Sequence, residues 1–162
     1  PLSRGQVKLH SADPRDRPAA HFNYLSHPQD LKELIEALKV MQDILTQPAF
    51  DGFRGKRITP APEVTSDREL ADYVRATADT DYHPCGTCKM GSDDQAVVDS
   101  ELRVHGIDGL RVVDASVMPS IVSGNLNAPT QMIAERAADY LLGKPPLSPE
   151  HPHFHFGDHS AT

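Results

Sequence analysis

The sequence has few cysteines, no long apolar run and no cluster of basic residues, and each absence excludes a class of protein. Two cysteines in 162 residues are too few for the disulfide framework of a small secreted domain. The apolar stretches, such as residues 110–113 with Arg111 among them, fall far short of the roughly 20 residues needed to span a bilayer. A net charge of −7 without a basic stripe argues against a general nucleic-acid surface. We therefore expect a soluble protein without a transmembrane segment or a nucleic-acid partner. Its expected location is the cytoplasm, with a membrane-peripheral or periplasmic location as the open alternatives.

The chain is long enough for one domain with its own core, and 38% of its residues are hydrophobic. Its first residues include no initiator methionine, no charged n-region and no apolar h-region, so no targeting signal is visible. We expect these residues to come from the middle of a larger polypeptide.

Three segments carry the signals of helices. Between residues 29 and 47 apolar residues recur at helical spacing until Pro48 ends the pattern. The pattern comprises Leu31, Leu34, Ile35, Leu38, Met41 and Leu45. A second helix is predicted to begin at Ser66, because Glu69 completes a capping box with it. A third is predicted from Pro129, a residue favoured at a first helical position, to Gly143, a residue favoured just after a helix.

Strand signals are shorter. Residues 5–10 alternate polar and apolar side chains, as a half-buried strand does, and a turn follows at residues 13–18. The glycine- and proline-rich stretch 50–62 is predicted as loop with a short strand at residues 57–59. Residues 110–114 form a short apolar run that ends in Asp114, which is typical of a buried strand whose carboxyl end faces a ligand.

The loop YHPCGTCKMG at residues 82–91 contains the first candidate catalytic residue, His83. An imidazole titrates near neutral pH, so it can accept the proton of an alcohol while the carbon–hydrogen bond breaks. Pro84 and Gly86 restrict and turn the backbone around it. The alternative is a loop histidine that only forms hydrogen bonds.

Asn127 is the second candidate, since its amide can both donate and accept hydrogen bonds and could hold a substrate hydroxyl opposite His83. The alternative is an ordinary N-cap for the helix that follows. The start of this helix, near Ala128, also presents unpaired N–H groups and a positive dipole end, which favour an anionic group such as a reduced flavin ring.

Cys85 and Cys88 have the CxxC spacing of thiol redox centres and of half a zinc site, and His83 adds a third possible ligand. A structural zinc needs four ligands and no second cysteine pair exists, so two thiols that pack the loop are the favoured interpretation. Histidines near the carboxyl terminus could bind metal adventitiously, although a solvated tail is favoured. These are His151, His153, His155 and His159.

Three ordered motifs together resemble the C-terminal region of the glucose–methanol–choline (GMC) oxidoreductases, in particular the choline dehydrogenase-like alcohol dehydrogenases. They are YHPCGTCKMG, VVDSELRVHGIDGLRVVDASVMPS and GNLNAPTQMIAERAADYLL. The opening stretch through residue 31 also resembles the start of that region, so the resemblance covers residues 1–143.

The resemblance implies FAD-dependent oxidation of a small alcohol to an aldehyde or ketone, with hydride transfer to flavin N5. His83 would be the catalytic base and Asn127 its partner at the alcohol oxygen. The residues expected to lie against the flavin are Asp114, Ala115, Asn127, Ala128, Pro129 and Thr130.

The implied fold is α+β, with three regions. Residues 1–104 would form a substrate-binding domain with a mixed or antiparallel sheet, helices and the catalytic loop. Residues 105–143 would supply a strand and a helix that complete an FAD-binding α/β domain, and residues 144–162 a flexible His-rich tail. The chain departs from the family pattern because it lacks the strand–GxGxxG–helix unit for the ADP part of FAD. We therefore expect an N-terminal FAD-binding half as partner, in cis or as a separate chain.

Two hypotheses from other classes remain open at this point. The chain could be a non-catalytic fragment or partner subunit that binds through its unpaired strand and helix. It could instead be a thiol or metal module built on His83, Cys85 and Cys88.

Overall fold

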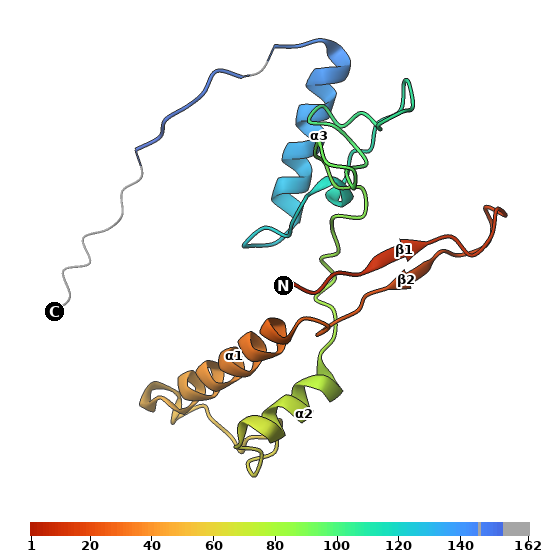
Figure 1. Ribbon diagram of the computed structural model, residues 1–162. Helices are drawn as coiled ribbons and strands as arrows, with labels where there is room; N and C mark the ends of the chain where they lie inside the picture. The colour runs from red at the N-terminus through yellow and green to blue at the C-terminus, as the bar shows by residue number, and fades with distance from the viewer. Residues whose placement is uncertain (146, 154–162) are drawn as a thin grey trace. The chain divides into compact units, whose positions relative to one another are not determined.

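The computed structural model describes residues 1–145 and 147–153 (Figure 1). The chain divides into two compact units, residues 1–82 and 83–162. The first unit contains β1 (Gln6–Lys8), β2 (Ala19–His21), α1 (Pro28–Thr46), the short 3-10 helix η1 (Pro48–Phe50) and α2 (Asp67–Thr77). The second contains the short 3-10 helix η2 (Ala115–Val117) and α3 (Asn127–Leu142). The predicted substrate-binding region, 1–104, includes the first unit and extends into the second.

Strands β1 and β2 form a two-stranded antiparallel sheet in which Val7 pairs with Ala20. The strand predicted at residues 5–10 is confirmed over Gln6–Lys8, and the turn at 13–18 lies between the two strands. The prediction that this strand is half-buried is wrong, because all three of its residues are exposed. Each strand pairs with one other strand, and no layer among the described residues packs against this sheet. The apolar side chains of the alternating pattern therefore stay exposed.

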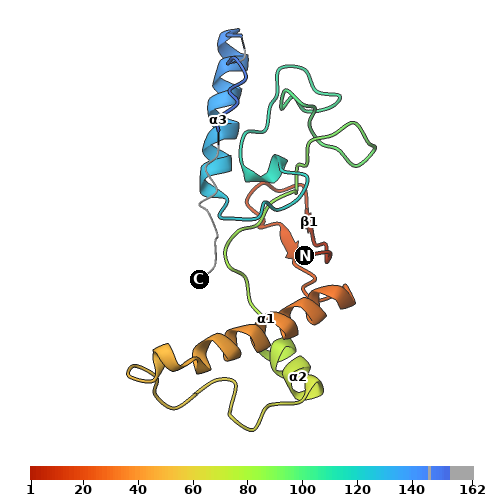
Figure 2. The ribbon, with the colours of Figure 1, turned by 90° about the vertical axis from the view of Figure 1, so that its left-hand side faces the viewer.

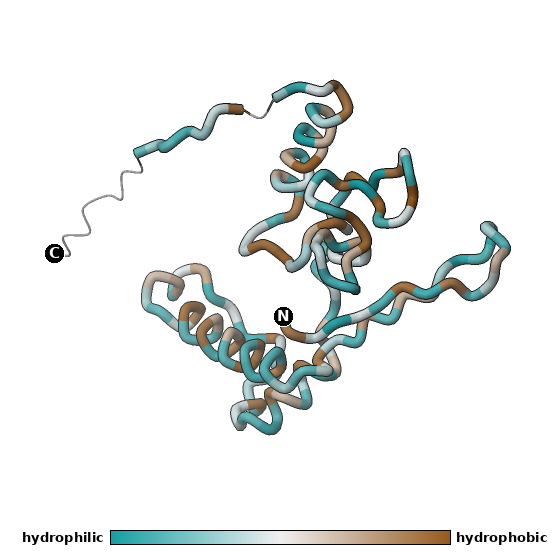
Figure 3. The backbone as a smooth tube through the Cα atoms, turned by 45° about the horizontal axis from the view of Figure 1, so that its top comes forward, coloured by the Kyte–Doolittle hydropathy of each residue, from teal (hydrophilic) through white to brown (hydrophobic). Residues whose placement is uncertain are grey.

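Helix α1 confirms the first helix prediction. His27 caps its start, because the ring Nδ1 accepts a hydrogen bond from the N–H of Gln29 at 3.2 Å, and Pro28 follows as a first-turn residue. The helix ends at Thr46, before Pro48, as the sequence predicts. Brown and teal alternate along α1 in Figure 3, which reflects the helical spacing of its apolar residues.

Helix α2 begins with the predicted capping box. The Ser66 hydroxyl accepts the N–H of Glu69 at 3.3 Å, and the Glu69 carboxylate accepts the N–H of Ser66 at 2.9 Å. Leu70 and Val74 then face Ile35 of α1, and these three residues form the buried core of the first unit. Helices α1 and α2 accordingly lie side by side in both views (Figures 1 and 2).

A buried carboxylate anchors the start of the first unit. Asp30, in the first turn of α1, accepts the backbone N–H groups of Leu2 and Ser3, both at 2.7 Å. The hydrogen bond from Leu2, followed by those from Ser3, lowers the pKa of Asp30 from 3.8 to about 2. The ionised carboxylate therefore ties the amino-terminal segment to α1.

Two predicted strands are wrong. Residues 57–59 are loop. Residues 110–114 form only an isolated antiparallel bridge, in which Arg111 pairs with Arg103, and Leu110 and Val113 are exposed. The segment meets a single short partner, with the N–H of Val112 donating to the Leu102 carbonyl at 3.1 Å. The parallel neighbours that would extend it into a buried strand are not among the described residues.

The second unit has its own core, made by Val98, Leu102, Val117 and Ala137. Ala137 comes from α3, whose end at Gly143 confirms the predicted stop: Gly143 has φ 64° and is left-handed.

The predicted start of α3 at Pro129 is wrong, because the helix begins two residues earlier at Asn127 and Leu126 occupies the cap position. Proline is tolerated there because none of the first four N–H groups has an intrahelical partner. The alternative that Asn127 is the N-cap is therefore also wrong.

Beyond Gly143, residues 144–145 and 147–153 form no helix or strand. The tail predicted at 144–162 lies partly outside the described residues, as do His155 and His159. Within the described part of the chain, no helix combines the length and the apolar character needed to cross a membrane.

Candidate active site

His83 is the first residue of the second unit and lies in a loop, directly before Pro84. It is half-buried, and its ring has no hydrogen-bond partner among the described residues. A base that must receive a substrate proton needs a ring nitrogen free of such a partner. The position of His83 is therefore compatible with the predicted role.

The loop after His83 is fixed against η2. The N–H of Cys88 donates to the Ser116 carbonyl at 2.9 Å, and the N–H of Met90 donates to the Val117 carbonyl at 2.8 Å. Gly86 has φ +87°, and a Cβ placed on it would lie 3.3 Å from the Met118 carbonyl oxygen. Glycine is required here for its left-handed backbone and for this close approach. These contacts join the first of the three sequence motifs to the second.

Asp114 shapes η2. Its carboxylate accepts the N–H of Ser116 at 2.8 Å and also the Ser116 hydroxyl, so Asp114 caps this short helix. The same Ser116 offers its carbonyl to the His83 loop. Asp114 therefore caps the short helix η2, against which the His83 loop is hydrogen-bonded. The half-buried Ala115 is the first residue of η2.

The start of α3 carries the third motif. Asn127, its first residue, is exposed, and its Oδ1 accepts a hydrogen bond from Gln131 Nε2 at 3.1 Å. Ala128 is exposed as well, while Pro129 and Thr130 are half-buried. Leu126 provides no side-chain cap, so the first N–H groups of α3 have no side-chain acceptor. The helix start therefore presents hydrogen-bond donors and a positive dipole end.

One core holds the three motifs in the second unit. Met90 of the loop, Val117 of η2 and Ile133 of α3 all belong to the cluster around Val98 and Leu102. Within the described residues, no hydrogen bond joins His83 to Asn127. The structure thus brings their supporting segments into one unit, without a hydrogen bond between the two side chains among the described residues.

The two cysteines are free and half-buried. Among the described residues, no group of three or more His, Cys, Asp or Glu side chains could hold a metal ion. The zinc interpretation of His83, Cys85 and Cys88 consequently has no support from the structure.

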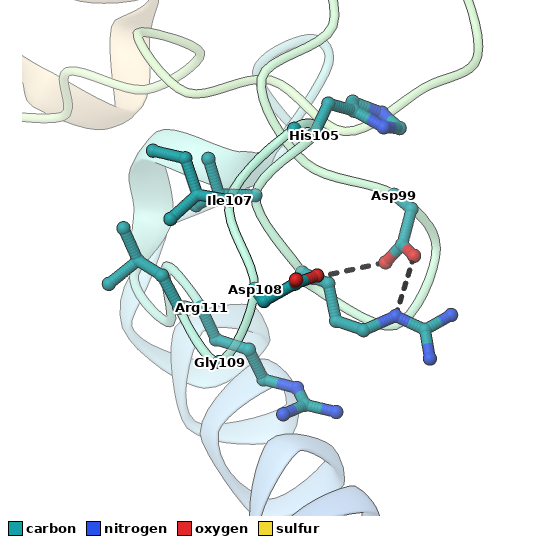
Figure 4. Close-up of a pocket in the computed structure, with 10 residues that line it drawn as sticks. Asp99, His105, Ile107, Asp108, Gly109 and Arg111 are labelled. Carbon is teal, nitrogen blue, oxygen red and sulfur yellow. Dashed lines mark hydrogen bonds and ion pairs between the residues drawn. The ribbon is translucent and has the colours of Figure 1, made fainter.

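Two hollows in the second unit were not predicted from the sequence. One is a polar pocket of about 230 Å³ inside the loop 99–111, shown in Figure 4 with His105 and Arg111 on its wall. Backbone and side-chain hydrogen bonds from Arg103, together with one from Glu101, lower the pKa of Asp99 to about 2. The Asp99 carboxylate and the Arg103 guanidinium form an ion pair at 2.8 Å, and this pair stabilises the turn of the loop.

The other hollow is an apolar groove of about 330 Å³ along α3. Met90, Met118 and Met132 line it, and the Arg136 guanidinium lies 4.3 Å from the centre of the Tyr140 ring at the same groove. The groove runs past Pro129, so it adjoins the first turn of α3. Its apolar residues could be found from the sequence, but the segments that converge on it are far apart in the chain.

The family model for GMC oxidoreductases matches residues 1–134. The oxygen-dependent choline dehydrogenase of Cronobacter sakazakii is 55% identical over 145 residues, which cover 90% of this chain and 26% of that protein. The enzyme of the same name from Escherichia coli O45:K1 is 54% identical over the same share of each chain. The chain thus spans about a quarter of the length of these curated relatives.

Solved structures with a similar fold also come from flavoenzymes of this family. Pyridoxine 4-oxidase from Mesorbium loti is 34% identical with a TM-score of 0.83, over 94% of this chain and 28% of that one. Formate oxidase from Aspergillus oryzae is 32% identical with a TM-score of 0.82, over 88% of this chain and 25% of that one. The fold is therefore that of the C-terminal domain of FAD-dependent flavoproteins, with helices and a small antiparallel sheet. The resemblance found in the three sequence motifs is confirmed, and the chain belongs to the GMC oxidoreductase family.

Proposed function

We propose that this chain forms the C-terminal part of an FAD-dependent dehydrogenase that oxidises a small alcohol, with choline as the first substrate to test. The observation that carries the proposal is the support of all three motifs by one core, which places the His83 loop and the start of α3 in the same unit. The 55% identity to choline dehydrogenases supports the choice of substrate. The reaction takes place in the cytoplasm in this proposal.

His83 is the base of the proposed reaction. Its ring accepts the hydroxyl proton of the alcohol while the hydride leaves the neighbouring carbon and the carbonyl double bond forms. The half-buried position and the absence of a competing hydrogen-bond partner among the described residues support this role. The bonds from Cys88 and Met90 to η2 limit the movement of the loop that carries it.

Asn127 holds the alcohol oxygen in this proposal. It is the first residue of α3 and its side chain does not cap the helix, and with Oδ1 engaged by Gln131 its Nδ2 is available to a ligand. The uncapped N–H groups beside it favour an atom with negative charge.

FAD, the cofactor of the family, supplies the acceptor of the hydride when it is bound. The donor-rich start of α3 fits an electron-rich ring, so Asn127, Ala128, Pro129 and Thr130 are proposed to hold the flavin. Asp114 and Ala115 complete the set, with the carboxylate of Asp114 engaged in shaping η2.

The ADP part of FAD needs a binding unit that this sequence does not contain. No GxGxxG fingerprint is present, and the chain matches only about a quarter of each curated relative. We therefore propose an N-terminal FAD-binding half as partner, in cis or as a separate chain. A non-catalytic role is not favoured by the comparisons.

The test is choline-dependent reduction of flavin by this chain together with its FAD-binding half. We expect His83→Ala to slow reduction by about 10²–10⁴-fold, which is the usual contribution of a general base. His10→Ala, which changes an exposed histidine of the first unit, is the matched control and should reduce flavin at the parent rate. Equal rates for the two variants would show that His83 is not the base.

A further inference from the structure

Gln131 lies one helical turn after Asn127 on α3, and its Nε2 donates to Asn127 Oδ1 at 3.1 Å. Among the described residues, this is the one hydrogen bond of the Asn127 side chain. Both side chains are exposed, so neither is fixed by burial in the core of the second unit. The bond to Gln131 is therefore the contact that orients the Asn127 amide in this structure.

The direction of this bond has a chemical consequence. An asparagine side chain has an acceptor oxygen at one end and a nitrogen with two donor hydrogens at the other. Because the donor of Gln131 engages the oxygen, the nitrogen is the end left for a ligand. The uncapped N–H groups at the start of α3 are donors too. The whole start of the helix therefore offers donors.

We propose that Gln131 is a positioning residue that keeps Asn127 Nδ2 turned toward the alcohol oxygen. The inference rests on the proposed function. As the hydroxyl proton moves to His83, negative charge develops on the alcohol oxygen, and a donor already aimed at that oxygen stabilises the transition state. The hydride of the neighbouring carbon–hydrogen bond, with its electron pair, would pass to the FAD that the complete assembly supplies, and the carbon–oxygen double bond would form.

Two substitutions separate this role from a structural one, with flavin reduction by choline measured in the complete FAD-loaded assembly. Gln131→Met keeps side-chain length and helix propensity but removes the donor, so reduction should slow about twofold while the Kd of choline stays the same. Gln131→Glu places an acceptor against Asn127 Oδ1 and should turn the amide over. The loss should then be larger than in Gln131→Met, although Glu is closer to Gln in shape.

Glu135→Met is the control, because Glu135 is exposed one turn further along α3 and should be replaceable without a change in rate. In the background of Asn127→Ala, adding Gln131→Met should cause no further loss, since Gln131 acts through Asn127. A further loss in the double variant would overturn the proposal. So would Gln131→Glu reducing flavin as fast as the parent or faster than Gln131→Met.

Different results would contradict the proposed function of Asn127 and the positioning role of Gln131. If Asn127→Ala reduces flavin at the parent rate, the proposed function of Asn127 is wrong and the role of Gln131 falls with it. If Asn127→Ala is slow while both Gln131 variants match the parent, the proposed function stands and the positioning role is wrong.

Discussion

Replacing Gly86 with alanine tests how the His83 loop is held against η2. The left-handed backbone of Gly86, at φ +87°, costs an alanine roughly 1–2 kcal/mol. The lower entropy of the unfolded alanine chain offsets about 0.4–1 kcal/mol of this. The new Cβ also meets the Met118 carbonyl at 3.3 Å, and forcing this backbone atom aside adds about 1 kcal/mol or more. We expect a net loss of about 1.5–3 kcal/mol.

Gly106→Ala is the matched control. Gly106 is also left-handed, at φ +77°, but a Cβ there would have no neighbour within 4 Å. It therefore carries the conformational cost alone, about 0.5–1 kcal/mol after the offset. The difference between the two variants measures the contact with Met118.

Thermal unfolding of the parent and both variants gives the comparison. For a chain of this size, 1 kcal/mol shifts the midpoint by about 2–4 °C, so Gly86→Ala should unfold about 3–12 °C below the parent and Gly106→Ala about 1–4 °C below it. Flavin reduction by the complete assembly should slow in Gly86→Ala alone, because only that change disturbs the loop of His83. Equal shifts for the two variants, together with an unchanged rate in Gly86→Ala, would refute the packing argument.

Two further predictions concern the first unit. Leu70→Ala removes a buried side chain between α1 and α2 and should lower the free energy of unfolding in urea by about 2–5 kcal/mol. Leu34→Ala, on the exposed side of α1, should lower it by less than about 1 kcal/mol. Equal losses would contradict the assigned core. The pKa of Asp30 is lowered from 3.8 to about 2 in the folded chain, so its ionised carboxylate stabilises the fold fully at pH values above 3.8. This stabilisation is lost as the pH falls toward about 2. Asp30→Asn should therefore flatten the acid limb of unfolding free energy against pH, and an unchanged limb would rule out this anchor.

The helices could be predicted because their signals are local. The capping box at Ser66 and Glu69 lies within four residues, and the stop at Gly143 needs one residue with a left-handed backbone. The strands could not, because a strand is defined by its partners. Residues 110–114 have the composition of a buried strand, but within the described part of the chain they pair with residues 102–104 alone.

The candidate site likewise has residues that the sequence predicts and contacts that it does not predict. His83 could be identified from its motif and the chemistry of imidazole, but the hydrogen bond that fixes its loop joins Cys88 to Ser116 across 28 residues of sequence. No local pattern indicates that pairing. Asp99 was missed for a similar reason, because its low pKa depends on how the loop folds Arg103 back onto it.

Asn127 shows why the position of a residue within a helix decides its chemistry. An asparagine two residues before a proline at a helix start suits both an N-cap and a ligand-binding side chain, so the sequence left both open. An N-cap side chain accepts an N–H from the first turn, which would occupy its oxygen and hold it against its own helix. In the structure Leu126 takes the cap position and Asn127 is helical, so its amide turns outward and meets Gln131 instead. The helix start thus keeps its own donors uncapped and adds those of Asn127 to them, which is the arrangement that the proposed oxidation would use at the oxygen that gains charge.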